Sequence, residues 1–315
     1  MSNAVCTDGL AKTAVKLWRG DDESLAFQGA SANRVDSFTR AGEMLYLRLT
    51  SNRERLKEQI AAELDFIFYL RRGGVSAVPA VVSVNGQLVE EVNSADELFF
   101  ACAFEPAEGE RFNYADFSAS ARREHFRLRG RTLGQIHALS KNYVPAENFR
   151  RPAWHEDRLL REIENFLPVS EKVVRQQFER LREKLRALPQ TAETYGLIHG
   201  DFGETNYRYQ DARLNIFDFD DCSYHWFAYD LAISIYPHGW RTEGPRLLDW
   251  LLEGYAENAP VSFTRADITL FCHWRLIYMF LVYARKWGFK DLSPAQAAWF
   301  ARKRENIARG YEWAS

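Results

Sequence analysis

Residues 197–230 read LIHGDFGETNYRYQDARLNIFDFDDCSYHWFAYD, and this stretch decides how the rest of the chain is interpreted. Its polar residues stand between short apolar runs and include His199, Asp201, Asn206, Asp218 and Asp230. Carboxylates set among apolar segments need a cation or a reaction partner, because burying them unpaired is costly. The stretch therefore predicts a functional site rather than a solvated acidic tail.

Two short apolar segments in this stretch, residues 194–199 and 214–219, are expected to be strands that pair across a loop with a turn at Gln210 and Asp211. Such pairing would bring Asp201 and Asn206 opposite Asp218. Oxygen ligands from an amide and a carboxylate suit Mg²⁺, with water and phosphate completing the coordination. Asp201 would then be free to orient an attacking hydroxyl or accept its proton.

The composition excludes several classes of protein. With 315 residues, 46% of them hydrophobic, the chain can form one large or two ordinary domains, and its net charge of −2 gives no general reason to expect nucleic acid or an anionic membrane as partner. The four cysteines lie far apart without a CxxC pair, which indicates a reduced, cytoplasmic protein. The apolar stretch 268–287 contains His273, Arg275 and Arg285, so it is expected to be a buried helix.

The N-terminal third of the sequence has strand patterns. Strands are expected between residues 25 and 50, with a hairpin turn at Ala41–Gly42, and between residues 75 and 103, with a second hairpin at Asn85–Gly86. Between them, a capping box over residues 51–54 predicts a helix to about residue 72. Its inward face carries Glu63, for which Arg48 is the nearest partner in the sequence; alternatively, Glu63 lies at the edge of that face.

From residue 114 onward the patterns are mostly helical, with helices expected at about 118–140, 156–166, 170–188, 230–236, 244–258, 265–286 and 293–313. His137 in the first of these is expected to be a packed structural histidine. We place a domain boundary near residue 105. The fold class is α+β.

Three motifs occur in order: H-G-D at residues 199–201 followed by Asn206, then F-D-F-D-D at residues 217–221, then Y-D-L-A at residues 229–232. In this pattern the chain resembles the aminoglycoside phosphotransferase and choline kinase family. The resemblance implies a protein-kinase-like, two-lobed fold with residues 1–105 as a nucleotide-binding lobe, formed by an antiparallel sheet and a helix. Residues 106–315 would form a larger, mainly helical lobe that carries the catalytic and acceptor sites.

The resemblance also implies roles for the focal residues. Asp201 would be the catalytic base, Asn206 and Asp218 the magnesium ligands, and Asp230 a structural carboxylate behind the catalytic loop. His199 would hydrogen-bond the backbone. Where many members have His-Pro, this chain has Gly203 and Glu204, and it carries two further acids, Asp220 and Asp221. Asp220 is either a second metal ligand or, as we favour, a solvated or capping carboxylate.

In the N-terminal lobe, residues 29–35 are similar to the family's turn over the nucleotide phosphates, which implies nucleotide contacts from Ser31 and Asn33; a plain hairpin is the alternative. Arg48 and Glu63 fall where the family has the ion pair that holds the α- and β-phosphates, although its usual cation is lysine. Arginine can bind phosphate in a fork but is bulkier. Ala103 and Glu105 lie where the adenine hinge would be.

The leading hypothesis is therefore a kinase that uses ATP or GTP with Mg²⁺ to phosphorylate a hydroxyl of a small molecule. A protein Ser/Thr kinase of the same fold, a nucleotide-binding regulator without activity and a metal-dependent hydrolase are the alternatives. The hydrolase is disfavoured because the cluster lacks a second close histidine. The acceptor is expected against the C-terminal helices, whose aromatic and cationic residues are more often packing than ligands: Trp240, His273, Trp274, Arg275 and Tyr278. The near-neutral charge argues against a polycationic aminoglycoside.

Overall fold

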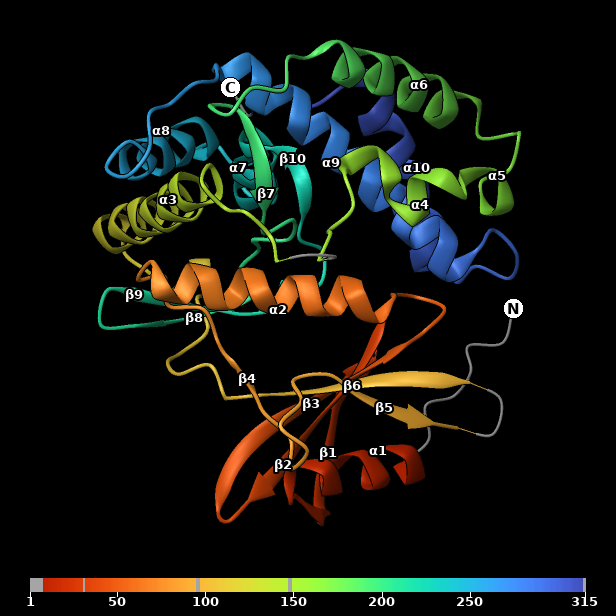
Figure 1. The fold of residues 1–315 in the computed structure, drawn as a ribbon. Helices are drawn as coiled ribbons and strands as arrows, with labels where there is room; N and C mark the ends of the chain where they lie inside the picture. The colour runs from red at the N-terminus through yellow and green to blue at the C-terminus, as the bar shows by residue number, and fades with distance from the viewer. Residues whose placement is uncertain (1–7, 31, 95–96, 147–148, 314–315) are drawn as a thin grey trace. The chain divides into compact units, whose positions relative to one another are not determined.

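The computed structural model describes residues 8–30, 32–94, 97–146 and 149–313. The chain divides into two compact units, which are described separately (Figure 1). The first unit comprises Met1–Arg111, Tyr143–Arg151 and Tyr207–Asp220; the second comprises Phe112–Asn142, Pro152–Asn206 and Asp221–Ser315. The chain therefore enters the first unit three times, and the last of these passages lies inside the focal stretch.

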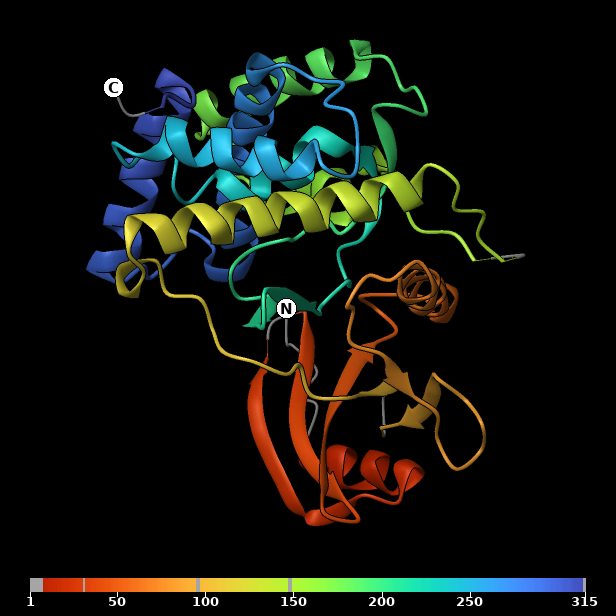
Figure 2. The same cartoon turned by 90° about the vertical axis from the view of Figure 1, so that its left-hand side faces the viewer.

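The first unit contains an antiparallel sheet in the order β1-β2-β3-β6-β4, with β5 also paired to β6. A short helix, α1, packs its apolar side chains onto one face of this sheet. Figure 2 shows this helix beside the N-terminal strands. The turn between β2 and β3 has Ala41 and Gly42 in the left-handed region, with φ of 52° and 87°, which confirms the predicted hairpin. The elements are α1 (Asp8–Val15), β1 (Asp21–Ala30), β2 (Asn33–Arg40), β3 (Glu43–Ser51), β4 (Ala80–Val81), β5 (Glu90–Asn93) and β6 (Leu98–Phe104).

Helix α2 (Lys57–Arg72) begins later than predicted. Ser51 still pairs with Phe99 in the sheet, and its Oγ accepts from the Arg53 N–H at 3.0 Å in a turn that precedes the helix, whose N-cap residue is Leu56. The predicted capping box is therefore wrong. The inward face of the helix is as expected from Ile60 onward, because Ile60, Glu63, Ile67 and Leu70 are buried, whereas Leu56, which was expected on the same face, is exposed at the N-cap.

The second predicted hairpin is wrong in its pairing, although the turn is present. Gly86 has φ of 74° and donates its N–H to the carbonyl of Ser83 at 3.1 Å. The strands on either side, β4 and β5, pair with β6 and not with each other. Strand β6 has seven residues and β4 has two, so β5 can form more backbone hydrogen bonds with β6 than it could with β4.

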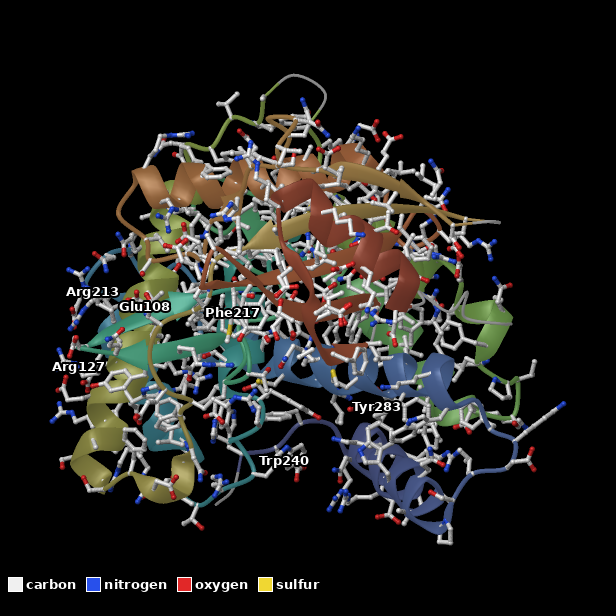
Figure 3. The ribbon with its side chains drawn as sticks, turned by 90° about the horizontal axis from the view of Figure 1, so that it is seen from below. Glu108, Arg127, Arg213, Phe217, Trp240 and Tyr283 are labelled. Atoms are coloured by element: carbon white, nitrogen blue, oxygen red, sulfur yellow. The ribbon has the colours of Figure 1, made fainter. Side chains whose placement is uncertain are left out.

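The pairing expected inside the focal stretch is also wrong. In the first unit, β8 (Tyr207–Gln210) and β9 (Arg213–Ile216) form a hairpin through Asp211 and Ala212, both of which have left-handed backbone conformations. Arg213, at the start of β9, and Phe217, directly after it, are labelled in Figure 3. In the second unit, β7 (Tyr195–Ile198) pairs instead with β10 (Ser223–Trp226). A two-residue turn closes β8 onto β9 locally, which leaves β7 to pair with β10.

The second unit is mainly helical, as predicted. Helices α3 and α8 approach closely at three glycines, and a Cβ on Gly130 would lie 1.8 Å from the carbonyl oxygen of Leu251. Among the helices of the described residues, none is long and apolar enough to cross a membrane. The helices are α3 (Ala119–Ser140), α4 (Arg158–Arg161), α5 (Ile163–Phe166), α6 (Lys172–Ala187), α7 (Phe227–Ile235), α8 (Gly244–Tyr255), α9 (Arg265–Trp287) and α10 (Pro294–Arg309).

Candidate active site

A buried carboxylate holds the turn that follows β7. Asp230, in the first turns of α7, accepts hydrogen bonds from the backbone N–H groups of His199 at 2.8 Å and Gly200 at 2.9 Å. Gly200 has φ of 83°, and a Cβ there would lie 2.1 Å from the carbonyl oxygen of Asp221. Only glycine fits this turn. The structural role predicted for Asp230 agrees with these contacts.

Asp230 is stabilised from behind by α3. Its Oδ2 lies 3.2 Å from His137 Nε2, and the other ring nitrogen of His137 lies 3.1 Å from the Tyr255 hydroxyl. Burial alone would raise the pKa of Asp230, but the hydrogen bonds and charges of His137, His199 and Gly200 outweigh it and lower that pKa. His137 is therefore the packed structural histidine that was predicted.

The turn presents Asp201, whose two carboxylate oxygens have different partners. Oδ2 accepts from Asn206 Nδ2 at 2.8 Å, and Oδ1 accepts from Arg275 Nη2 at 2.5 Å. His199 Nδ1 accepts from the Asp201 N–H at 3.2 Å, which agrees with the predicted backbone role of this histidine. The Asp201 side chain is still 32% exposed. It is thus fixed in orientation and open to an acceptor.

Arg275, on α9, was not predicted to contact Asp201. Its guanidinium is mostly buried and lies over the Tyr278 ring, 5.6 Å from the centroid. Burial would lower the pKa of Arg275, but Asp201 and Tyr229 outweigh this and raise it, so the side chain stays charged. The signal in the sequence was a cation within an otherwise apolar helix, which is usually retained for a specific partner.

Asn206 is suited to hold a cation. Both of its hydrogen bonds to Asp201, to the carboxylate and to the backbone carbonyl, use the amide nitrogen, so Oδ1 can face a metal. Asp218, in the first unit, has φ of 64°, a conformation that few side chains adopt and that is frequent at functional positions. The oxygen donors of these two residues fit Mg²⁺. Within the described parts of the chain, no group of three or more His, Cys, Asp or Glu side chains could hold a metal.

In the first unit, Arg48 on β3 forms the predicted ion pair with Glu63 on α2. Nη1 and Nη2 lie 2.8 and 2.7 Å from the two carboxylate oxygens, and both residues are buried, which rules out the edge position for Glu63. Arg48 Nε is a buried donor without a hydrogen-bond partner among the described residues. A buried, unsatisfied donor of this kind fits an anionic oxygen such as that of a nucleotide phosphate.

Asp220 is held by cations of the first unit and is not solvated, which corrects that part of the prediction. Arg55 Nε donates to its Oδ1 at 3.3 Å, and Arg151 donates to its backbone carbonyl. Burial would raise the pKa of Asp220, but Arg55, Arg48 and Arg151 lower it well below its usual range. These arginine contacts were not predicted for Asp220, and they do not test its alternative role as a second metal ligand.

The remaining nucleotide-site candidates lie near the same sheet. Asn33 begins β2 and accepts from the Thr50 hydroxyl at 2.8 Å, while Ser31 lies outside the described residues. Ala103 is buried in β6 between β3 and β4. The N–H of Glu105 donates to Pro79 O at 3.2 Å, so this amide is already engaged. These contacts leave the hinge assignment a prediction.

Glu204, between Asp201 and Asn206, has partners that the sequence did not reveal. Its Oε1 lies 2.8 Å from His238 Nε2 and 3.4 Å from Arg129 Nη1 on α3. The loop between Asp201 and Asn206 is thereby attached to α3. Both partners are more than thirty residues away in the sequence, and no local pattern marks them.

Most of the predicted acceptor residues pack elsewhere. Trp274 is buried against Phe178, with ring centroids 5.6 Å apart, and Trp240 contacts Tyr311 (Trp240 is labelled in Figure 3). Tyr278 donates to Asp157 Oδ2 at 3.1 Å. Of the residues proposed for the acceptor, Arg275 is the one bonded to Asp201.

The sequence model of the phosphotransferase enzyme family matches residues 27–266. The chain belongs to the phosphotransferase enzyme family. The predicted resemblance, the protein-kinase-like α+β fold and the assignment as a phosphotransferase enzyme are thereby confirmed.

Several proteins of known name are similar to most of this chain. Amicoumacin kinase of Bacillus subtilis (strain 168) is 28% identical over 233 residues, which cover 73% of this chain and 68% of that protein. The structure of an amicoumacin kinase in complex with AMP-PNP, Ca²⁺ and Ami has a TM-score of 0.88 and 27% identity, covering 96% of this chain and 93% of that one. A microcompartment-associated aminopropanol kinase has a TM-score of 0.76 and 22% identity, covering 96% and 95%. The amicoumacin kinases are kinases of a small molecule, which supports the predicted small-molecule kinase activity.

Proposed function

We propose that this phosphotransferase moves the γ-phosphate of ATP or GTP to a hydroxyl group of a small molecule. The observation that carries the proposal is the state of Asp201: its carboxylate is fixed on one side by Asn206 and on the other by Arg275, yet remains accessible. A carboxylate held in this way can orient an acceptor hydroxyl and accept its proton as the O–P bond forms.

The other residues have supporting roles in the proposal. Asn206 and Asp218 would hold Mg²⁺, which would neutralise charge on the phosphates when bound. Arg48, kept in place by Glu63, would bind the α- and β-phosphates through donors that Glu63 leaves unused. Asn33 would support the phosphate loop together with Ser31, and the backbone near Ala103 and Glu105 would contact the base of the nucleotide.

Amicoumacin is the first acceptor to test, because the amicoumacin kinases match this chain at 28% and 27% identity over most of its length. Other hydroxylated amines, sugars and amino acids form the comparison panel. A protein acceptor, an inactive regulator and a hydrolase remain the alternatives to this proposal.

The decisive experiment measures phosphoryl transfer and nucleotide binding in the same variants. Asp201→Asn is expected to lower kcat by about 10³-fold or more while the Kd for AMP-PNP changes less than about threefold. Asp291→Asn is the matched control, since Asp291 is an exposed aspartate of the same unit and should keep full activity. Undiminished transfer by Asp201→Asn would refute the proposed role.

A further inference from the structure

A pocket in the second unit is separate from the catalytic turn. It lies among α6, α9 and the end of α10, which pack against one another, and has a volume of about 310 Å³. Its α9 residues include Thr269 and His273. Successive residues of a helix are about 100° apart, so His273 and Arg275 point to opposite sides of α9. The pocket therefore lies on the face of α9 turned away from Asp201.

The charged side chains that line the pocket are all cationic. Arg180 and Lys184 come from α6, and Arg309 is the last residue of α10; no aspartate or glutamate lines it. Arg180 and Lys184 are one helical turn apart, so their like charges face the same side and repel. Three positively charged side chains around a small pocket favour the binding of an anionic ligand.

These cations also lack acidic partners, in contrast to their neighbours. Arg175 and Arg182 on the same helix pair with Glu164 and Glu179. Over the described part of the chain, neither Arg180 nor Lys184 has an ion pair, and Arg309 donates only to the Asn306 amide, at 2.7 Å. The three cations around the pocket therefore keep their charge available to a ligand.

His273 lines this pocket, and the cations around it affect its pKa. Its Nε2 lies 3.2 Å from the carbonyl of Ile307, and the chain then turns at Gly310, whose φ is 94°. Burial lowers the pKa of His273, the bond to Ile307 raises it, and the charges of Arg180 and Lys184 lower it further. His273 therefore lies close enough to Arg180 and Lys184 for their charges to lower its pKa.

We propose that this pocket binds a small molecule with two or more clustered anionic oxygens, such as a phosphate or a polycarboxylate group, through Arg180, Lys184 and Arg309. Guanidinium and ammonium groups are the side chains that bind such oxygens most strongly. Leu181, Leu270 and Tyr311 form apolar walls that limit the size of the ligand. The site is independent of the proposed transfer reaction.

The test uses the full chain saturated with AMP-PNP, so that added anions cannot report the nucleotide site. Inorganic phosphate, citrate and uncharged glycerol are titrated while the His273 imidazole resonance, identified with His273→Gln, is followed by NMR. Phosphate or citrate is expected to shift this resonance saturably, whereas glycerol is not. The tighter of the two anions identifies the ligand as a phosphate or a polycarboxylate.

Variants separate a built site from general attraction to positive charge. Lys184→Gln and Arg309→Gln are expected to weaken binding about tenfold each. Arg186→Gln removes an exposed cation from the same helix outside the pocket and should change Kd less than about twofold. The proposal is overturned if neither anion shifts the His273 resonance saturably, or if Arg186→Gln weakens binding as much as Lys184→Gln does.

Discussion

Arg275 Nη2 donates to Asp201 Oδ1 at 2.5 Å, across 74 residues of sequence. Arg275→Gln removes this contact, so the Asp201 carboxylate gains rotational freedom and kcat is expected to fall by about 10²-fold, with a smaller change in the KM for ATP. Steady-state kinetics with both substrates varied will show this. Arg275→Lys should recover part of the activity, and guanidinium added to Arg275→Gln should restore some of it. Arg302→Gln, an exposed arginine of the same unit, is the control.

Variants of the Arg48–Glu63 ion pair can separate its contribution to folding stability from its proposed contribution to nucleotide binding. Arg48→Met leaves the buried Glu63 carboxylate unpaired, and the free energy of unfolding should fall by about 3–5 kcal/mol. Arg48→Met/Glu63→Met removes both charges and should recover most of this loss. Both variants should bind AMP-PNP more weakly than the unchanged protein, with a higher Kd, because both lack the Arg48 guanidinium. A double variant that binds AMP-PNP normally would show that Arg48 serves the fold alone.

His125 should make the protein sensitive to acid. It is buried and stacked on Phe112, and burial, with smaller contributions from Arg129 and His238, lowers its pKa to about 2. The unfolded chain binds this proton at about pH 6.5, so below that pH the unfolded state holds more protons and stability decreases, by up to about 1.4 kcal/mol per pH unit. Above pH 6.5 the contribution is fully present. In urea unfolding between pH 5 and 8, His125→Phe should flatten this dependence, and the same change at exposed His155 should not.

Chelation tests the proposed metal ligands. EDTA is expected to abolish phosphoryl transfer and added Mg²⁺ to restore it. Asn206→Ala should raise the Mg²⁺ concentration for half-maximal activity about tenfold and also lower kcat, since Asn206 orients Asp201. Asn142→Ala, at an exposed position of the same unit, should change neither. An unchanged Mg²⁺ requirement in Asn206→Ala would contradict the assignment.

Residue types and their spacing were sufficient to predict the features that depend on local sequence. The hairpin at Ala41–Gly42, the inward face of α2 and the Arg48–Glu63 pair follow from short-range patterns. The predicted cap at Ser51 failed for a tertiary reason, because β6 pairs with β3 as far as Ser51 and keeps this residue in the sheet.

The contacts that complete the site could not be predicted in the same way. Arg275 reaches Asp201 across 74 residues, and Arg151 reaches the Asp220 carbonyl across 69. Each depends on how helices and loops pack, and a single arginine in a sequence does not indicate which carboxylate it will meet. The strand pairings of the focal stretch failed similarly, since β8 pairs with β9 across a two-residue turn and β7 pairs with β10, which is more distant in the sequence.

The contacts of Asp230 also bear on how the catalytic turn moves. Its carboxylate is fully buried and holds the amides of His199 and Gly200, the two residues immediately before Asp201. Hydrogen–deuterium exchange at these amides requires the carboxylate to be released, so they should exchange as slowly as those of the core helices. If Asp201 orients the acceptor as proposed, it does so directly after a segment that is expected to be rigid, and adaptation to different acceptors is then expected to come from the side chains around it.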